Sequence, residues 1–225
     1  MTGRVETADG KVYELKKKDE YGGDFHCALK VISVPGSQKE YDEMLESMSE
    51  FAMRAKLREK VEEISNEYRL LGALRGHPNV VNCEDQMIIP HENDMGWDIY
   101  IRMELLQSLP DYVRENGMTV DSVIKLGSDM CSALELCREN NIIHRDIKPQ
   151  NIFVSRYGVF KLGDFGVAKA STIRTSADKV GTYSYMAPEV YKGKGYDDRV
   201  DIYSLGMVLY WLLNDRRGPF LPMPP

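Results

Sequence analysis

Three oxygen-bearing side chains in two short segments carry the clearest chemistry of this sequence. One segment, residues 144–151, reads HRDIKPQN, and the other, residues 164–166, reads DFG. The carboxylate of Asp146 can accept the hydrogen bond of an attacking hydroxyl group. The amide oxygen of Asn151 and the carboxylate of Asp164 are hard ligands of the kind that Mg²⁺ prefers. Because phosphoryl transfer needs an aligned nucleophile and neutralised phosphate charge, these residues predict that chemistry, with Asn151 and Asp164 as metal ligands.

Two further segments stand in the order that completes a known pattern. Residues 27–30 read CALK and precede the HRD segment, and residues 187–189 read APE and follow DFG. The ordered set resembles the protein kinase family, in particular the bacterial (Hanks-type) serine/threonine protein kinases. The resemblance covers the chain from about Gly10 onward. It implies an α+β, two-lobed fold with a small β-rich N-lobe that contains helix αC and a larger, mainly helical C-lobe.

Bulk properties exclude several classes of protein. The chain has 225 residues, 43% hydrophobic and 28% charged, as in ordinary globular proteins. Its net charge of −6 does not favour non-specific binding to nucleic acid. It has no apolar run of membrane-spanning length and no signal core, so we expect no membrane contact within this chain. The four cysteines are expected to be reduced thiols in a cytoplasmic protein. The resemblance leaves open that this is the cytoplasmic kinase domain of a longer, membrane-anchored protein.

Hydrophobic periodicity predicts the elements of the first lobe. Residues 11–15 and 25–32 are expected to form strands, and residues 38–73 a long helical stretch with a break or a short second helix near 54–58. Helix αC of the family is shorter, so residues 37–60 are interpreted as an insertion ahead of it. This insertion is either a docking surface for a regulator or a solvated extension packed on its own lobe.

The second half of the chain alternates a hairpin with helices. A strand is expected from Asn79 and a hairpin over 86–90 and 97–104. A helix over 118–140 is expected to begin at Thr119, with one apolar side formed by Val120, Val123, Ile124, Met130, Leu134 and Cys137. The helix over 201–213 is apolar all round, which is typical of a buried helix.

Two lobes are expected, the N-lobe over 1–104 and the C-lobe over 105–225. Only twelve residues follow Leu213. The resemblance therefore implies that helices αG to αI are missing and that the C-lobe is incomplete at its end. A fragment of a longer protein is the simplest explanation.

The resemblance assigns a nucleotide site to both lobes. Lys30 binds the α- and β-phosphates of ATP and pairs with a glutamate of αC, for which Glu67 is the first candidate and Glu63 and then Glu62 are alternatives. The other expected contacts with ATP are Gly10 in the glycine-rich loop, Val12, Ala28 and Phe153 around adenine, Met103 as gatekeeper, and the main-chain groups of Glu104 and Leu106. Val5 and Thr7 stand where the family pattern has glycines. Their side chains should hinder the approach of backbone amides to phosphate.

The implied reaction is transfer of the γ-phosphoryl group of ATP to a serine or threonine hydroxyl of a protein substrate. Asp146 orients that hydroxyl and accepts its proton, and Lys148 offers a positive charge to the γ-phosphate. Asp201 is expected to cap backbone amides of the catalytic loop. His144, Phe165, Leu71 and Cys83 resemble the packed column that aligns the lobes.

A switch is implied as well. Kinases with an arginine at the place of Arg145 commonly dock a phosphorylated activation loop on it. Autophosphorylation is therefore expected within 167–180, at Thr172 or Thr175 first, with Ser171 and Ser176 as further candidates.

Two other functions remain open at this point. One is a nucleotide-binding pseudokinase or scaffold with weak activity, suggested by Val5 and Thr7. The other is a small-molecule phosphotransferase on a kinase-like fold, which would generally lack the long segment that ends in APE. Lys30, Asp146, Asn151 and Asp164 together favour the active protein kinase.

Overall fold

Two compact units make up the chain. The computed structural model describes residues 4–7, 10–18, 23–165, 169–170, 184–193 and 195–217. Unit 1 comprises residues 1–72 and 82–105, and unit 2 comprises residues 73–81 and 106–225. Segment 73–81 groups with unit 2 because it is hydrogen-bonded there. The Val81 N–H donates to the Leu162 oxygen at 2.8 Å, and Asn79 Nδ2 donates to the Phe160 oxygen at 3.0 Å.

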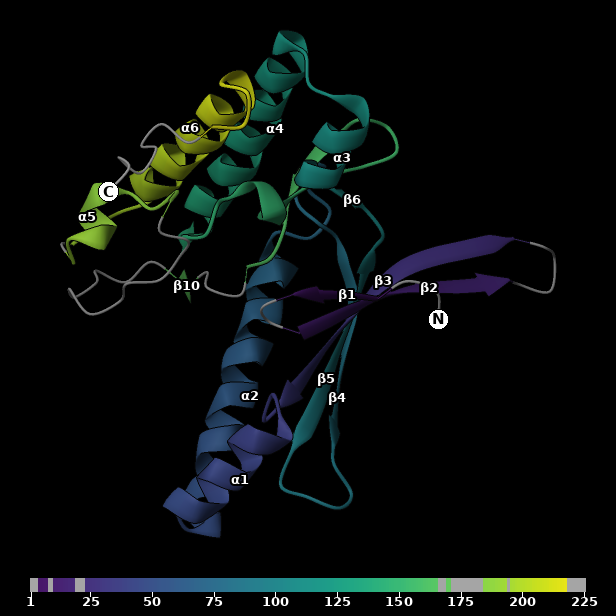
Figure 1. Cartoon of the computed structure of the whole chain (residues 1–225), viewed down its shortest axis with the longest axis vertical. Helices are drawn as coiled ribbons and strands as arrows, with labels where there is room; N and C mark the ends of the chain where they lie inside the picture. Colours follow the sequence, from purple (N-terminus) through teal and green to yellow (C-terminus); the bar gives the residue numbers. More distant parts are fainter. Residues whose placement is uncertain are drawn as a thin grey trace. The chain divides into compact units, whose positions relative to one another are not determined.

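Unit 1 is built on a five-stranded antiparallel sheet with the strand order β1-β2-β3-β5-β4 (Figure 1). The strands expected over 11–15, 25–32 and 86–90 are confirmed with longer bounds, and the one expected over 97–104 is confirmed as it stands. β1 is a strand that the sequence pattern did not indicate. The strands are β1 (Arg4–Thr7), β2 (Gly10–Lys18), β3 (Asp24–Val34), β4 (Cys83–Pro90) and β5 (Trp97–Glu104). β3 lies in the middle because it pairs with β2 on one side and with β5 on the other.

One face of this sheet contributes to the core of unit 1. Ala28, Lys30 and Val34 alternate along β3 and are buried, as are Ile99 and Ile101 on β5. Ile101 pairs with Lys30 across the strands, so the two side chains share that face. The period of two along the strands therefore decides which residues are buried.

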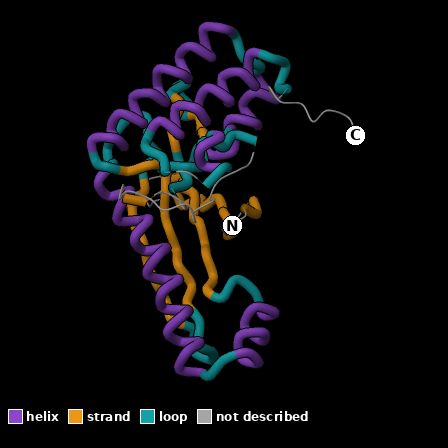
Figure 2. The backbone as a smooth tube through the Cα atoms, turned by 90° about the vertical axis from the view of Figure 1, so that its left-hand side faces the viewer, coloured by secondary structure: helices purple, strands orange, loops and turns teal. Residues whose placement is uncertain are grey.

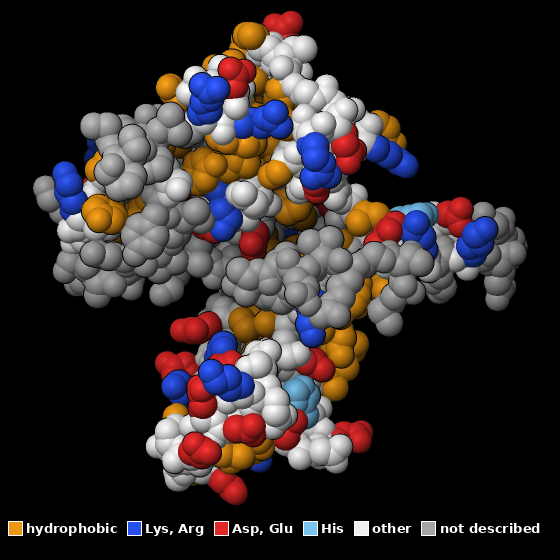
Figure 3. Space-filling view, in the orientation of Figure 1, with side chains coloured by type: hydrophobic (Ala, Val, Ile, Leu, Met, Phe, Trp, Pro, Cys, Tyr) orange, Lys and Arg blue, Asp and Glu red, His pale blue; other side chains and the backbone are white. Residues whose placement is uncertain are grey.

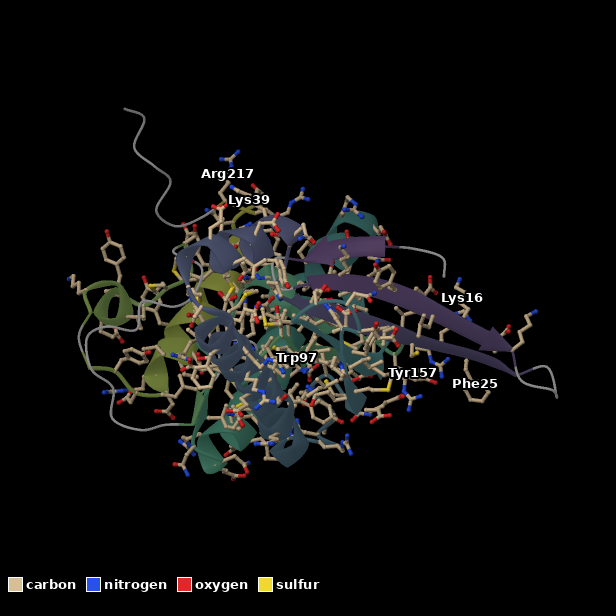
Figure 4. The ribbon with its side chains drawn as sticks, turned by 90° about the horizontal axis from the view of Figure 1, so that it is seen from below. Lys16, Phe25, Lys39, Trp97, Tyr157 and Arg217 are labelled. Carbon is tan, nitrogen blue, oxygen red and sulfur yellow. The ribbon has the colours of Figure 1, made fainter. Side chains whose placement is uncertain are left out.

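The hairpin of β2 and β3 extends past the rest of the sheet. β5 reaches β3 only as far as the pair of Cys27 with Glu104, so residues 16–18 pair with 24–26 and with no third described strand. Figure 4 shows Lys16 and Phe25 on this extension, where the Phe25 side chain is 62% exposed. The described side chains of the extension, at residues 16, 18 and 24–26, are exposed to solvent and do not cover the core.

Two helices follow β3 in place of the single stretch expected over 38–73. They are α1 (Gln38–Ser47), capped by Ser37, and α2 (Glu50–Ala73). The expected break near 54–58 is wrong, because α2 is continuous there and the interruption lies at Met48 and Ser49. Met48 is extended, with φ −150°, and the Ser49 carbonyl oxygen accepts the Met53 N–H at 2.9 Å. A serine that starts a helix outweighs the irregular apolar spacing near 58.

The apolar side of α1 and of the first half of α2 is buried within unit 1. Met44 is 6% exposed, Met53 0% and Leu57 1%. Figure 2 shows α2 running along the strands of unit 1, and Figure 3 shows charged side chains of both signs over this end of the unit. An ion pair between Lys60 and Glu40 at 3.0 Å joins the two helices. This packing agrees with the interpretation of residues 37–60 as an extension packed on its own lobe.

Unit 2 is mainly helical, with small sheets near the catalytic loop. Its helices are α3 (Leu109–Asn116), α4 (Val120–Glu139), α5 (Pro188–Tyr191) and α6 (Arg199–Leu213). A three-stranded sheet has the order β6-β8-β9, and β7 pairs with β10. Their bounds are β6 (Gln107–Ser108), β7 (Ile142–Ile143), β8 (Ile152–Val154), β9 (Phe160–Leu162) and β10 (Lys169–Ala170).

The strand expected from Asn79 is wrong, since only an isolated bridge joins Val80 to Leu162. An antiparallel sheet in one unit and a helical second unit give the expected α+β class.

Helix α4 begins as expected, because Thr119 Oγ1 accepts the Ser122 N–H at 3.2 Å. Its buried stripe runs through Val123, Leu126, Met130, Ala133, Leu134 and Cys137. Val120 and Ile124, expected on that side, are 63% and 62% exposed, so this part of the prediction is wrong. At 100° per residue both lie well to one side of a stripe centred on Met130. Burial raises the pKa of the Cys137 thiol to about 12, which agrees with a reduced core residue.

Helix α6 is buried on one side only. Val200, Leu205 and Val208 are buried, whereas Ile202, Tyr210 and Leu213 are 53%, 46% and 60% exposed. The expected burial all round is therefore wrong for the part of the chain that the structure describes. The α6 side chains that pack inward face α4 and the catalytic loop. None of the helices in the described residues is both long and apolar enough to cross a membrane.

Candidate active site

The polar residues of the loop from 144 to 151 form one hydrogen-bonded group in unit 2. Lys148 Nζ lies 2.6 Å from Asp146 Oδ2, and Asn151 Nδ2 donates to the same oxygen at 3.1 Å. Asn151 Nδ2 also donates to the main-chain oxygen of Asp146 at 2.8 Å. The loop ends in a 3-10 turn over Pro149–Asn151, where the fixed φ of proline suits the tight turn. The cation of Lys148 and the amide of Asn151 therefore meet at the carboxylate of the candidate base, Asp146.

Helix α6 anchors the start of this loop, as the sequence predicts. Asp201 is 2% exposed, and its two carboxylate oxygens accept the N–H groups of His144 and Arg145, each at 2.8 Å. Burial raises the pKa of the Asp201 carboxyl, while the nearby His144 and the two N–H donors favour its ionised form. Arg145 has a φ of 69°, a conformation that costs a non-glycine residue about 1–3 kcal/mol. The two bonds to Asp201 hold the backbone in this strained form.

The DFG segment is tied to the same loop. The Gly163 N–H donates to the Asn151 oxygen at 2.9 Å, and His144 Nε2 lies 3.1 Å from the Gly163 oxygen. The rings of His144 and Phe165 meet edge to face, with centroids 4.6 Å apart, and both side chains are fully buried. Asp164 follows Gly163 with a φ of 58°. The structure thus brings the two expected metal ligands, Asn151 and Asp164, to neighbouring positions of the backbone.

Gly163 is a residue of this site that the sequence analysis missed. A Cβ atom there would lie 2.7 Å from Val81 Cγ2 and 2.9 Å from Phe153 Cε2, closer than real contacts allow. Only a glycine therefore lets the chain pass between these side chains into Asp164. The one available signal was a glycine directly before the DFG motif.

The chemistry of Asn151 and Asp164 fits Mg²⁺. Asn151 uses its Nδ2 atom in bonds to Asp146, and within the described residues its Oδ1 atom accepts no hydrogen bond. Mg²⁺ commonly keeps several waters and takes one or two carboxylates together with substrate phosphates. Two protein ligands are therefore sufficient. No cluster of three or more His, Cys, Asp or Glu side chains suited to a metal occurs among the residues that the structure describes.

The residues expected around the nucleotide in unit 1 share one face of the sheet. Val12 pairs with Lys30, and Ala28 pairs with Met103, so these four side chains point to the same side. Lys30 is only 8% exposed, and a lysine so buried is one that commonly binds an anion. Gly10 begins β2 opposite Thr7.

Two expected parts of the site fall partly or wholly outside the described residues. Glu67 lies on α2, but its side chain is not described, and the side chains of Glu62 and Glu63 are exposed. The ion pair of Lys30 with Glu67 therefore stays a prediction. The candidate phosphorylation sites Thr172 and Thr175, with Ser171 and Ser176, also lie outside the described part of the chain.

The residues expected to contact adenine through their main chain lie at the end of β5 and just after it. Glu104 is the last residue of β5, and its Oε1 atom accepts the Asn82 N–H at 2.7 Å. Leu106 belongs to unit 2, where Phe153 on β8 is half-buried.

The four residues expected to form a packed column lie in both units. Leu71 and Cys83 are buried in unit 1, while His144 and Phe165 pack together in unit 2. The column through all four residues stays a prediction.

Comparison with known proteins agrees with this geometry. A probable serine/threonine-protein kinase of Clostridium perfringens is 41% identical over 140 residues, which are 60% of this chain and 20% of that protein. Serine/threonine-protein kinase PknB of Mycobacterium leprae is 37% identical over 156 residues, which are 66% of this chain and 25% of that protein. PknB of Mycobacterium tuberculosis is 41% identical over 149 residues, or 63% of this chain and 24% of that protein.

The chain thus spans about a quarter or less of the length of the curated relatives that it matches. The family model for the protein kinase domain matches residues 9–221, which is nearly the whole chain. Together with the arrangement of the HRD and DFG segments, this match shows that the chain belongs to the protein kinase family.

Proposed function

We propose that this chain is the catalytic part of an ATP-dependent serine/threonine protein kinase. The observation that carries the proposal is the convergence of Lys148 and Asn151 on Asp146 Oδ2, in a loop tied to Gly163 directly before Asp164. A base, a cation and two metal-ligand positions are what phosphoryl transfer requires of a protein. The printed names of the relatives support a serine or threonine acceptor.

Each residue has a definite task in the proposed reaction. Asp146 accepts the proton of the substrate hydroxyl, and Lys148 places its charge at the γ-phosphate. Mg²⁺ held by Asn151 and Asp164 would neutralise the charge on the phosphates. Lys30, paired with Glu67, binds the α- and β-phosphates. The remainder of ATP is bound by Gly10, Val12, Ala28, Met103, Glu104, Leu106 and Phe153.

The proposal includes a regulated enzyme in the cytoplasm. Autophosphorylation of Thr172 or Thr175 would give Arg145 a phosphate to bind.

A regulator that docks at residues 37–60 would meet few apolar groups. Among the large hydrophobic residues there, only Leu45 and Phe51 are well exposed, with exposed fractions of 43% and 86%. The burial of Met44, Met53 and Leu57 favours the structural role of this extension.

Replacement of the base tests the proposal directly. Asp146→Asn keeps the size of the side chain and removes its basicity, so ATP binding should persist while turnover falls by about 10²–10⁴-fold. The assay is transfer of radiolabelled phosphate from ATP with Mg²⁺ to a generic basic protein, with identification of the modified residues by mass spectrometry.

A matched control separates this effect from a general loss of acidic groups. Asp121 lies exposed in the first turn of α4, and Asp121→Asn should leave phosphate transfer unchanged. Near-normal turnover by Asp146→Asn, or phosphate found only on tyrosine, would contradict the proposed reaction.

A further inference from the structure

The last residue of β5 is joined to the residue before β4 by a reciprocal pair of hydrogen bonds. The Glu104 N–H donates to the Asn82 oxygen at 3.1 Å, and the Asn82 N–H donates to Glu104 Oε1 at 2.7 Å. One bond joins main chain to main chain, while the other uses the carboxylate of Glu104. Together they close a ring that fixes both the backbone and the side chain of this residue.

The carboxylate takes the place of a main-chain acceptor at an irregular point of the sheet. The ladder between β4 and β5 shifts register between Cys83 and Asp85, next to Asn82. Regular pairing therefore does not continue through this segment, and an N–H group that is partly buried needs an acceptor from elsewhere. A carboxylate that accepts a main-chain N–H forms a charge-assisted bond, which is stronger than a neutral one.

The fixed residue stands where the proposed nucleotide site takes its main-chain contacts. On the proposed function, the backbone of Glu104 meets the adenine edge, and Leu105 and Leu106 lead the chain into unit 2. A main-chain oxygen can select adenine only if its direction is held. We infer that the Glu104 side chain is a positioning residue for adenine, which holds the Asn82 N–H and thereby orients its own backbone toward the base.

Three substitutions at one position test this inference. Glu104→Ala removes the acceptor, and the KM for ATP should rise about tenfold, since a bond to a charged group contributes at least about 1.4 kcal/mol. The kcat should stay unchanged, and the preference for ATP over GTP should fall, because the backbone no longer selects the base. Glu104→Gln retains an oxygen acceptor, and its KM and its preference for ATP should return close to those of the wild-type chain. Should Glu104→Ala fail to fold, Glu104→Asp takes its place as the test. Its carboxylate is one methylene shorter and reaches the Asn82 N–H less well, so the KM for ATP should rise, but by less than about tenfold.

A carboxylate on the neighbouring strand β4 provides the control. Glu84 pairs with Arg102 at 2.9 Å, and both side chains are about half exposed. Glu84→Gln removes one negative charge from the strand next to β5 but no bond to Asn82. Its KM for ATP and its preference for ATP over GTP should equal those of the wild-type chain.

The outcomes separate this inference from the proposed function. If the wild-type chain binds ATP with Mg²⁺ in calorimetry but Glu104→Ala has an unchanged KM, the inference is overturned alone. The same holds if kcat falls in place of the rise in KM, or if Glu104→Gln is as impaired as Glu104→Ala. A wild-type chain that binds no ATP overturns the proposed function, and the inference with it.

Discussion

The carboxylate of Asp201 on α6 accepts the main-chain N–H of His144 at 2.8 Å, although 57 residues separate the two in the sequence. The second oxygen of the same carboxylate accepts the Arg145 N–H, also at 2.8 Å. One buried side chain therefore sets the position of the backbone immediately before Asp146. The stability of unit 2 and the geometry of the base depend on the same two bonds.

Loss of this anchor should affect both. Asp201→Ala leaves two buried N–H groups without acceptors, so the free energy of unfolding should fall by about 2–5 kcal/mol. Chemical denaturation measures this loss, and phosphate transfer measures the accompanying fall in kcat. Asp198→Ala is the matched control, because Asp198 begins the same helix without a side-chain capping bond and its replacement should cost less than about 0.5 kcal/mol. Equal stabilities of the two variants would contradict the anchoring role.

The β4–β5 hairpin should make the stability of unit 1 depend on pH. His91 Nδ1 lies 2.6 Å from Asp94 Oδ1, and Nε2 lies 3.3 Å from Asp98 Oδ1. Partial burial lowers the pKa of His91, but the two carboxylates outweigh it, so the pKa is raised above 6.5. Burial likewise raises the pKa of Asp98, yet Ser33 and His91 outweigh it and the pKa is lowered below 3.8.

The sign of each contribution follows from these directions. The stabilisation by protonated His91 is fully present below pH 6.5 and is lost as the pH rises through the raised pKa. The stabilisation by ionised Asp98 is present above pH 3.8 and is lost as the pH falls through the lowered pKa. His91→Gln should therefore lower the free energy of unfolding by up to about 1 kcal/mol near pH 6, and the difference from wild type should shrink toward pH 8.

Gly96 gives an independent check of the same hairpin. A Cβ atom at this position would clash with His91 Nδ1 and lie 2.8 Å from Asp94 Oδ1. Gly96→Ala should displace the imidazole ring and reduce the pH dependence, as His91→Gln does. Denaturation curves at several pH values measure both variants, and an unchanged pH dependence in both would rule out the role of His91.

The extension of residues 37–60 should contribute to the stability of unit 1. Leu57 is 1% exposed, so Leu57→Ala removes buried methyl groups and should cost about 2–5 kcal/mol. The neighbouring Arg58 is exposed, and Arg58→Ala should change the stability by less than about 0.5 kcal/mol. Thermal or chemical unfolding compares the two. A mild effect of Leu57→Ala would mean that the extension opens without loss of the core.

Asn151 should link the base to the metal. Its Nδ2 atom binds Asp146, and its Oδ1 atom is the proposed ligand of Mg²⁺. Asn151→Ala should lower kcat and raise the concentration of Mg²⁺ that gives half-maximal activity by at least about tenfold, since even the loss of a residue that only supports a metal ligand commonly has an effect of that size. Asn116→Ala removes a comparable amide bond on the exposed surface and should change neither quantity. Removal of Mg²⁺ with a chelator should abolish transfer by the wild-type chain.

Several features of this protein follow from the sequence by itself, because they depend on neighbours along the chain. Thr119 starts α4 through a bond to Ser122, three residues on, and the period of two along β3 buries Ala28 and Lys30 together. Asp146 and Asn151 lie in one short loop, so the sequence already places the base close to a metal ligand. The break between α1 and α2 is also local, since Ser49 is a good capping residue, but the apolar spacing near 58 concealed it.

Other features were decided only by the tertiary structure. Val120 and Ile124 have the types of core residues, yet no described element covers them, so they are exposed. Gly163 and the bond from Asn82 to Glu104 depend on side chains that come from distant parts of the sequence. The residue types determined which chemistry is available, because that depends on the donor and acceptor atoms of each side chain. The fold determined which of those atoms meet, because burial and hydrogen bonding depend on neighbours that the linear order does not contain.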